Sequence, residues 1–428
     1  MTQATAAPTV SAQFDVESFR KDLETAYTHI LARADKPAPD TPVVDVEAAA
    51  SIPIPQHRTI DSAVRLFSVD MKDSIQASLL RSARYKKLID KALADQQLPK
   101  GLAYLPVIES AYVPTLTSRA GAHGIWQFMP DTAREYGLRV DWWVDERADP
   151  TLSTRAAAAY LRDLYRQFDD WALTLAAYNA GPGRVKRAME STGASSFWEL
   201  LEQQALPKET RGYVPTFFAT LLIASDPQTY GFELGKPFDF DDKKVDVEGP
   251  VSLRYLAEVA GVDEDLLKEM NPSLRRSIVP PGRTTVRVPS KAADTVLARA
   301  KTLKQEDAYV QLCSYTLRDG DSLNRLARAL GTKPETLQAM NERDSARQGD
   351  TIYLPVRARE LGSLLAHSED REVFYAVKKG DTLYSVAKRH NLTVAELRDL
   401  NDLSSTTKLH PGQRLRILAA RTLSAGGM

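Results

Sequence analysis

The chain has 428 residues, of which 43% are hydrophobic and 26% charged, and Lys plus Arg and Asp plus Glu number 56 each. These values are typical of a soluble protein of roughly two to four globular domains. The zero net charge disfavours nucleic acid as a partner, because an extended polyanion selects a basic surface.

The cysteine, histidine and hydropathy patterns exclude further classes. A lone cysteine, Cys313, excludes an internal disulfide framework, and the six histidines lack metal-site spacing such as HExxH. We therefore expect no metal and no cofactor. No apolar run approaches the ~20 residues that span a bilayer, so no transmembrane segment is expected.

The first residues, "MTQATAAPTVSAQFDV", lack the basic start and apolar centre of a signal peptide. The protein therefore either stays in the cytosol, or the sequence is that of a mature or trimmed form with an added Met.

The N-terminal part is predicted to consist of a linker and a helical region. Residues 1–56 end in the Pro- and Ala-rich stretch "ADKPAPDTPVVDVEAAASIPIPQ", which predicts a flexible N-terminal segment. From about residue 60 the apolar residues Val64, Phe67 and Met71 recur at helical spacing.

More helical patterns follow. "TLSTRAAAAYLRDLYRQF" offers Ser153 or Thr154 as N-cap, "DWALTLAAYNAGPGRV" ends in turn residues, and "TRGYVPTFFATLLIAS" is a further apolar stretch. We therefore predict one all-α domain over residues 57–235.

The C-terminal half contains an internal repeat. "YTLRDGDSLNRLARALGTKPETLQAMN" (315–341) and "YAVKKGDTLYSVAKRHNLTVAELRDLN" (375–401) align throughout, and "SLRYLAEVAGVDEDLLKEMN" is a weaker copy with Pro250–Val251 in place of Gly-Asp. Each copy reads as strand, turn, two short helices and strand. The predicted modules span residues 243–290, 312–356 and 373–418.

The repeat resembles the LysM family, βααβ modules that bind the N-acetylglucosamine-containing backbone of peptidoglycan or chitin. The resemblance rests on the Gly-Asp-[Ser/Thr]-Leu turn, the Asn that closes the second helix, and the Gly before the last strand. It implies glycan contacts at two loops, formed by Gly320, Asp321, Ser322, Leu323, Gly380, Asp381, Thr382 and Leu383. A generic interaction array is the alternative, and Asp321 and Asp381 serve equally well as turn residues.

A carboxylate in an apolar stretch is the main candidate for chemistry. Glu109 directly follows Leu105–Pro106–Val107–Ile108. Either it lies on the wet face of a helix, or it is buried at a cost that raises its pKa and makes a proton donor.

Glycosidic bonds are usually cleaved with two carboxyl groups, so a partner for Glu109 is of interest. Asp131 fits a helix N-cap. The acids of "VDERADP" fit a salt-bridged loop. No second carboxylate has an apolar setting like that of Glu109.

Four motifs in order resemble the soluble lytic transglycosylase-like catalytic domain of family 1 lytic transglycosylases. They are "ESAYVPTLTSRAGAHGIWQFMPDTAREYGL", "DERADPTLSTRAAAAYL", "AAYNAGPGRV" and "LPKETRGYVP". A helical domain followed by LysM repeats is similar to the membrane-bound D type. The resemblance implies a multidomain α+β protein: an all-α lysozyme-like catalytic domain followed by three small βααβ LysM domains.

The resemblance also implies a mechanism with one catalytic acid, Glu109. It would protonate the oxygen between MurNAc and GlcNAc, the N-acetyl oxygen would form an oxazolinium, and Glu109 would then deprotonate the C6 hydroxyl to close a 1,6-anhydro ring. That accounts for the missing second carboxylate.

Other positions are expected to bind substrate by the same resemblance. These are Ser118, Gln127, Met129, Tyr178, Asn179, Glu209 and Tyr213. Glu209 could equally be an acid at a helix N-terminus, while Trp126 and Phe128 are expected in the core.

The sequence thus predicts a peptidoglycan lytic transglycosylase that acts on glycan strands. Ordinary muramidase hydrolysis and a non-catalytic wall-binding scaffold remain the alternatives. Such a function predicts the periplasm or cell envelope, with the export signal missing from the sequence. No cysteine precedes Cys313, so an outer-membrane lipid anchor is unsupported.

Overall fold

The computed structural model describes most of the chain, in two compact units of residues 1–310 and 311–428. The described residues are 16–33, 52–237, 241–301, 313–318, 321–330, 332–356, 373–390, 394–399, 401, 403 and 408–417. Gly320, expected at a glycan-binding loop, lies outside them.

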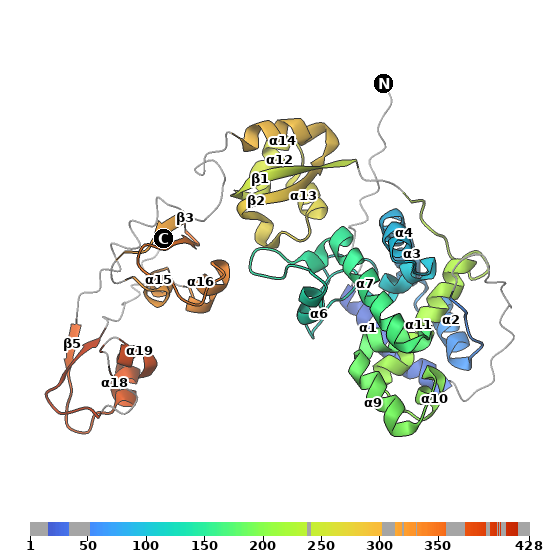
Figure 1. Cartoon of the computed structure of the whole chain (residues 1–428), viewed down its shortest axis with the longest axis horizontal. Helices are drawn as coiled ribbons and strands as arrows, with labels where there is room; N and C mark the ends of the chain where they lie inside the picture. The colour runs from blue at the N-terminus through green and yellow to red at the C-terminus, as the bar shows by residue number, and fades with distance from the viewer. Residues whose placement is uncertain are drawn as a thin grey trace. The chain divides into compact units, whose positions relative to one another are not determined.

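The first unit begins with helices around one apolar core (Figure 1). The most buried is α11, which packs against α1, α2 and α8. The helices are α1 (Val16–Arg33), α2 (Arg58–Val69), α3 (Lys72–Ser82), α4 (Lys86–Asp95), η1 (Lys100–Tyr104), α5 (Leu105–Ser110), α6 (Pro130–Glu135), η2 (Glu146–Ala148), α7 (Pro150–Phe168), α8 (Trp171–Ala180), α9 (Pro182–Thr192), α10 (Phe197–Glu202) and α11 (Lys208–Ser225). This arrangement confirms the predicted all-α, lysozyme-like domain.

Helix α1 departs from the flexible segment predicted for residues 1–56. Its apolar side chains recur at three- and four-residue steps, and Phe19, Leu23, Tyr27 and Ile30 are buried in the core. The Pro- and Ala-rich composition that suggested a linker belongs to the stretch after this helix. Residues 16–33 are therefore part of the helical domain.

Helix α7 begins earlier than its sequence suggested. Asp149, not Ser153 or Thr154, is the N-cap, and its Oδ1 accepts hydrogen bonds from the backbone N–H groups of Thr151 (2.7 Å) and Leu152 (2.9 Å). Pro150 occupies the first helical position, where its missing N–H costs nothing. Ser153 and Thr154 are buried instead.

A small module completes the first unit. Strand β1 (Asp242–Ser252) pairs antiparallel with β2 (Ile278–Pro289), and Val245 and Val247 on β1 are buried with Val286 and Val288 on β2. The connecting helices are α12 (Leu253–Ala260) and α13 (Glu264–Met270), with the one-turn η3 (Arg275–Ser277) before β2. After η4 (Ser290–Ala292), helix α14 (Ala293–Ala300) packs on β1 and α12, so the module extends beyond the predicted end at residue 290.

The second unit contains two βααβ modules, each with its own core. In one, β3 (Cys313–Thr316) pairs with β4 (Thr351–Leu354) around α15 (Leu323–Ala329) and α16 (Pro334–Met340). In the other, β5 (Val373–Ala376) pairs with β6 (Arg414–Ile417) around α18 (Leu383–Arg389) and α19 (Val394–Asp399). The order strand, helix, helix, strand is the one that the repeat predicted.

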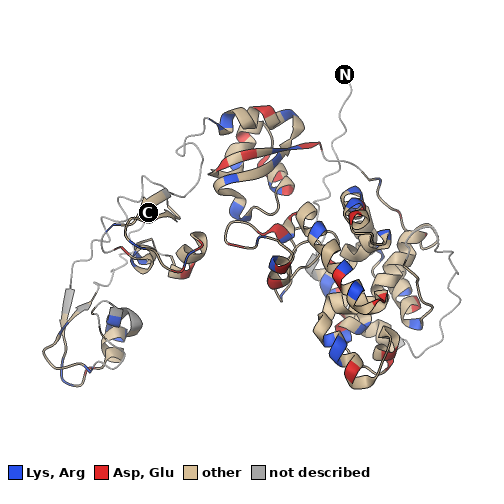
Figure 2. Cartoon of the chain, in the orientation of Figure 1, with Lys and Arg blue, Asp and Glu red and all other residues tan. Residues whose placement is uncertain are grey.

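Charges of both signs are interspersed along the described helices, in line with the balanced composition (Figure 2). In the part of the chain that the structure describes, no helix combines the length and apolarity needed to cross a membrane.

Candidate active site

Glu109 is carried by a short helix whose ends are fixed by the core. Helix α5 follows directly on η1, and the chain leaves it through Ala111 and Tyr112, both in left-handed conformation with φ of 49° and 60°. The hydroxyl of buried Ser110 donates to the backbone oxygen of Ile125 at 2.8 Å. This bond ties the helix that carries Glu109 to the loop that forms the next wall of the site.

The Glu109 carboxyl is held in a poorly solvated position. Burial raises its pKa to about 8, even though the Tyr213 hydroxyl, which donates a hydrogen bond to Oε1, acts in the opposite direction. The nearby charge of Glu209 raises the pKa further. Glu109 is therefore not on a wet helix face, and its carboxyl keeps its proton to a higher pH than an exposed glutamate does.

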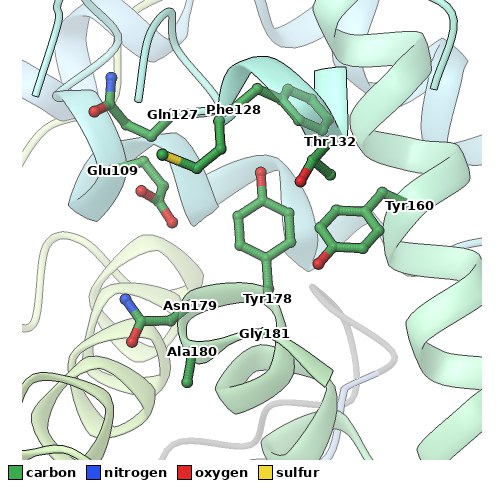
Figure 3. A pocket seen from close by; sticks show the side chains of 10 residues that line it. Glu109, Gln127, Phe128, Thr132, Tyr160, Tyr178, Asn179, Ala180 and Gly181 are labelled. Atoms are coloured by element: carbon green, nitrogen blue, oxygen red, sulfur yellow. The ribbon is translucent and has the colours of Figure 1, made fainter. Parts of the chain in front are cut away.

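A cavity of about 320 Å³ opens in front of this carboxyl (Figure 3). Its walls come from α5, the loop before α6, α6 itself, α7 and the C-terminal end of α8. The lining residues are Glu109, Gln127, Phe128, Met129, Thr132, Tyr160, Tyr178, Asn179, Ala180 and Gly181. Among these described lining residues, Glu109 is the sole carboxylate.

The backbone of the loop wall is constrained by hydrogen bonds and by a close contact with Arg147. Gln127 has φ of 49°, and its side-chain Nε2 donates to the backbone oxygens of Gly124 (2.8 Å) and Leu116 (3.2 Å). Gly124 has φ of 85°, and a Cβ there would lie 1.9 Å from the backbone oxygen of Arg147. Glycine is therefore required at this position. Met129, at the cavity edge, is 44% exposed.

The facing wall is held by hydrogen bonds between α8, α11 and the loop. The Tyr178 hydroxyl donates to the backbone oxygen of Trp126 at 2.7 Å, and burial raises the Tyr178 pKa well above its usual value. Asn179 Nδ2 donates to Glu209 Oε1 at 3.1 Å, and its Oδ1 accepts from Thr210 at 2.8 Å. Tyr178 thus braces the loop wall, while Tyr213 orients Glu109.

The residues expected at the site divide into groups. Gln127, Met129, Tyr178 and Asn179 line the cavity with Glu109. Tyr213 is outside the lining set but donates a hydrogen bond to Glu109. The remaining two expected residues, Glu209 and Ser118, do not line the cavity.

Glu209 is exposed and reaches the site through Asn179. Ser118 is buried outside the lining set, and its Oγ accepts a hydrogen bond from the backbone N–H of Ala122 at 2.8 Å, which closes the turn 118–122.

Sequence reasoning missed five lining residues, namely Phe128, Thr132, Tyr160, Ala180 and Gly181. The Tyr160 ring lies at a tilt beside the rings of Tyr178 and Tyr136, with 5.4 Å and 5.0 Å between the ring centroids. The available signal was the tyrosine directly after the alanine run of α7, where small neighbours leave room for a ring to face a cavity.

The loops expected to bind glycan show turn chemistry. Asp321 Oδ2 accepts from the Tyr315 hydroxyl (2.6 Å) and the Arg318 N–H (2.8 Å). Asp381 makes the same pair of bonds with Tyr375 and Lys378 in the last module. Ser322 and Thr382 are the N-caps of α15 and α18, Leu323 is buried, Leu383 packs partly on its core, and Gly380 has φ of 91°.

Comparison with known proteins gives matches to family models over much of the chain. Residues 87–201 match the Transglycosylase SLT domain, residues 315–354 and 375–418 the LysM domain, and residues 243–305 the lytic transglycosylase MltD LysM-like domain. A lysozyme-like helical domain of the SLT type followed by LysM-type modules defines the class: the chain is a lytic transglycosylase, with the SLT domain as its catalytic domain.

Individual relatives narrow this class. Membrane-bound lytic murein transglycosylase D of Escherichia coli K12 is 34% identical over 356 residues, which cover 79% of this chain and 77% of the relative. The chain belongs to the membrane-bound lytic murein transglycosylase D family. Soluble lytic murein transglycosylase of the same strain is 31% identical over 142 residues, 32% of this chain and 22% of that protein.

Among solved structures, the 70-kDa soluble lytic transglycosylase of Escherichia coli has 22% identity and a TM-score of 0.31, with 44% of this chain and 32% of that chain covered. At that score the likeness adds nothing to the family assignment.

Proposed function

We propose that this enzyme cleaves the MurNAc-β-1,4-GlcNAc bond of peptidoglycan with intramolecular formation of 1,6-anhydro-MurNAc, and that Glu109 is its catalytic acid and base. One observation carries the proposal: a single carboxyl, with its pKa raised to about 8 by burial, faces a cavity with no second acid among its described lining residues.

The first step uses the protonated form of Glu109. The carboxyl donates its proton to the glycosidic oxygen while the bond from that oxygen to C1 of MurNAc breaks, and GlcNAc leaves as an alcohol. The N-acetyl oxygen of the same MurNAc forms a bond to C1, which gives an oxazolinium. Glu109 is left as a carboxylate.

The second step restores the acid. The Glu109 carboxylate takes the proton of the C6 hydroxyl, O6 bonds to C1, and the bond from C1 to the N-acetyl oxygen breaks. The product is a 1,6-anhydro ring, and no water enters. A hydrolase of this fold would need a second group to hold a water, and two carboxyl groups are the usual arrangement for that.

The neighbouring residues have supporting roles in this proposal. Tyr213 orients the Glu109 carboxyl through its hydrogen bond. Gln127, Met129, Tyr178 and Asn179 hold the sugars along the cavity, with Glu209 at its far side. Ser118 is assigned a donor role toward the N-acetyl group or Glu109.

The LysM modules are proposed to bind the glycan strand and keep the enzyme on its substrate. Weak sites joined by linkers raise the local concentration of the polymer. Since peptidoglycan lies outside the cytoplasmic membrane, we assign the enzyme to the periplasm or cell envelope.

Mass spectrometry of sugars released from purified peptidoglycan tests this function. Wild-type enzyme should release muropeptides one water lighter than reducing ones, and Glu109→Gln should release none. Glu190→Gln, which alters an exposed acid on α9 outside the cavity lining, serves as control and should behave like wild type. Release of reducing sugars by the wild type would mean muramidase hydrolysis. Binding of the wild type to peptidoglycan without any released product would mean a non-catalytic scaffold.

A further inference from the structure

One loop of the module formed by β1, β2 and α12–α14 contacts the helical domain backbone to backbone. Its segment 271–278, between α13 and β2, runs beside the loop 141–145. The Asp145 N–H donates to the backbone oxygen of Ser273 at 2.9 Å, and the Arg275 N–H donates to that of Trp143 at 2.9 Å. The two loops are thus joined backbone to backbone, like the ends of two strands.

Two arginine side chains extend this contact. Arg275 Nη1 donates to the backbone oxygen of Asp141 at 2.7 Å, and Arg276 Nη1 to that of Trp142 at 2.6 Å. The Arg276 guanidinium also lies 4.0 Å from the centre of the Trp142 ring, a cation–π distance. Each arginine therefore fixes the backbone of the facing loop at a defined point.

Two further contacts hold the same module. Arg84 on the segment before α4 pairs with Glu269 on α13, and Arg287 Nη2 on β2 donates to Thr151 on α7 at 2.8 Å. The module therefore meets the helical domain at three separate places.

The contacted loop leads directly to the cavity. Asp145 forms a buried, two-bond ion pair with Arg147, with 2.8 Å between Oδ1 and Nε and between Oδ2 and Nη2. Arg147 Nη1 donates in turn to the backbone oxygens of Gly121 (2.8 Å) and Phe128 (2.9 Å). Phe128 lines the same cavity as Glu109. Successive contacts through Asp145 and Arg147 therefore join Ser273 to the loop wall of the site.

The same module lacks the turn seen in the two modules of the second unit. There an aspartate, Asp321 or Asp381, closes the turn before the first helix. Here β1 runs into α12 through Ser252, the helix N-cap, and Val251 on the strand is buried. The segment before β2, which is exposed around Asp344 in the second unit, lies here against the helical domain.

We propose that the module of residues 242–300 is a brace of the catalytic domain and not a third glycan-binding module, with Arg275 and Arg276 as positioning residues. They hold the loop 141–145 and, through Arg147, the wall formed by Gln127, Phe128 and Met129. This wall holds the sugars, whereas Glu109 and its partner Tyr213 belong to α5 and α11. The inference rests on the proposed function for its kinetic consequence only.

The test uses the full chain with Arg275→Ala and Arg276→Ala combined. In hydrogen exchange, the amides of 141–147 and 121–128 should exchange about tenfold faster, because two charge-assisted hydrogen bonds are lost. With solubilised peptidoglycan strands, KM should rise about tenfold while kcat changes less than about threefold, since a displaced wall weakens sugar binding. The alkaline midpoint of the pH profile should stay in place, because the contacts of Glu109 are untouched.

Controls separate this role from a loss of folded enzyme. A merely unfolded fraction would lower kcat and leave KM unchanged. Arg283→Ala removes an exposed arginine that pairs with Asp246 inside the module, and it should change neither exchange nor KM. Arg275→Lys with Arg276→Lys should recover part of the KM effect, since lysine keeps the charge but has a different donor geometry.

Three results would overturn the brace. Unchanged exchange at 141–147 in the double alanine variant would mean that these arginines do not hold the loop. Faster exchange with an unchanged KM would mean that the contact does not reach the cavity. Protection of segment 271–278 of the wild type by N-acetylglucosamine oligomers would make the module a glycan site. If the wild type released no anhydro product, the proposed function would fail, while the exchange arm would still decide whether the module holds the loop.

Discussion

The hydroxyl of Tyr213 on α11 donates a hydrogen bond to the carboxyl of Glu109 on α5, two residues that lie 104 positions apart in the chain. The bond favours the ionised carboxyl, and burial opposes it more strongly, so that the Glu109 pKa is raised to about 8. A group that must give and then take a proton at neutral pH needs this balance, since its two forms must both be accessible. In the proposed mechanism, this pair would set the pH range over which Glu109 can both donate and accept a proton.

Replacement of Tyr213 by Phe tests this balance. The lost hydrogen bond stabilised the carboxylate, so the Glu109 pKa should rise and the alkaline limb of the pH–rate profile should move upward. The carboxyl also loses its orientation, and we expect kcat to fall about tenfold or more. The profile of kcat/KM between pH 5 and 10 measures both effects. Tyr165→Phe, on a ring stacked against Trp171, should keep the wild-type profile, and a downward shift in Tyr213→Phe would contradict the assignment.

Glu109→Gln should stabilise the first unit at alkaline pH. The folded-state pKa of about 8 lies above the ordinary glutamate pKa of 4.5, so the folded protein binds more protons than the unfolded chain between these values. Stability of the wild type therefore falls as pH rises through this range. The neutral amide avoids this loss, and we expect it to be more stable at pH 8 by about 1–3 kcal/mol, with the gap closing toward pH 4.5. Urea unfolding followed by tryptophan fluorescence at pH 5 and pH 8 measures the difference.

Tryptophan fluorescence is well suited to this measurement, because all five tryptophans lie between residues 126 and 198 and report on the helical domain. A gap of equal size at both pH values would show that Glu109 does not titrate in this range.

Breaking the buried pair of Asp145 and Arg147 should cost more stability than breaking an exposed pair, because it leaves a buried charge without its partner. Both side chains are nearly inaccessible to solvent. Burial by itself would raise the pKa of Asp145, but the hydrogen bonds from Arg147 lower this pKa below its usual value. Asp145→Asn leaves the guanidinium with a neutral partner, and we expect a loss of about 3–5 kcal/mol. Lys91→Ala breaks the exposed pair with Asp95 and should cost no more than about 0.5 kcal/mol. The contribution of Asp145 should persist above the ordinary pKa of aspartate and disappear as acid protonates it in the folded state.

Gly124→Ala should destabilise the loop wall more than a glycine change elsewhere. Its Cβ would lie 1.9 Å from a backbone oxygen, so the loop must move. We expect a loss of about 3 kcal/mol or more, together with reduced turnover. Gly193→Ala has a similar positive φ of 72° but open space around it, and should cost only about 1 kcal/mol. Equal losses from the two changes would mean that left-handed backbone strain, and not the contact with Arg147, governs this position.

The sequence contained the main feature of the site, because a glutamate after four apolar residues has few explanations once the fold is helical. The sequence indicated Tyr213 as a site residue but not its hydrogen bond to Glu109, because a contact between α5 and α11 depends on the packing of the whole domain. Tyr160 and Thr132 were missed for the same reason: helical periodicity gives a buried face, but not which part of that face borders a cavity. Helix α1 was missed because the composition of its neighbours outweighed its own pattern of Phe19, Leu23 and Ile30.

The module of residues 242–300 shows a different limit. Its repeat pattern predicted the strands and helices but not the contact of Arg275 and Arg276 with the loop 141–145. Two adjacent arginines are common on solvated surfaces, and nothing local shows that they face backbone oxygens from another domain.

The glycan binding proposed for the second unit should depend on the shape of two turns. Asp321 and Asp381 each fix a turn through a tyrosine hydroxyl and a backbone N–H. With both replaced by Ala, the turns lose these bonds, and binding of the full chain to purified peptidoglycan should weaken about tenfold or more, since two linked sites fail together. Turnover of short soluble strands should stay near the wild-type rate, because the helical domain is unchanged. Glu335→Ala, an exposed acid on α16, is the matched control and should bind normally. Co-sedimentation with peptidoglycan gives the affinities, and undiminished binding by the double variant would place glycan recognition outside these turns.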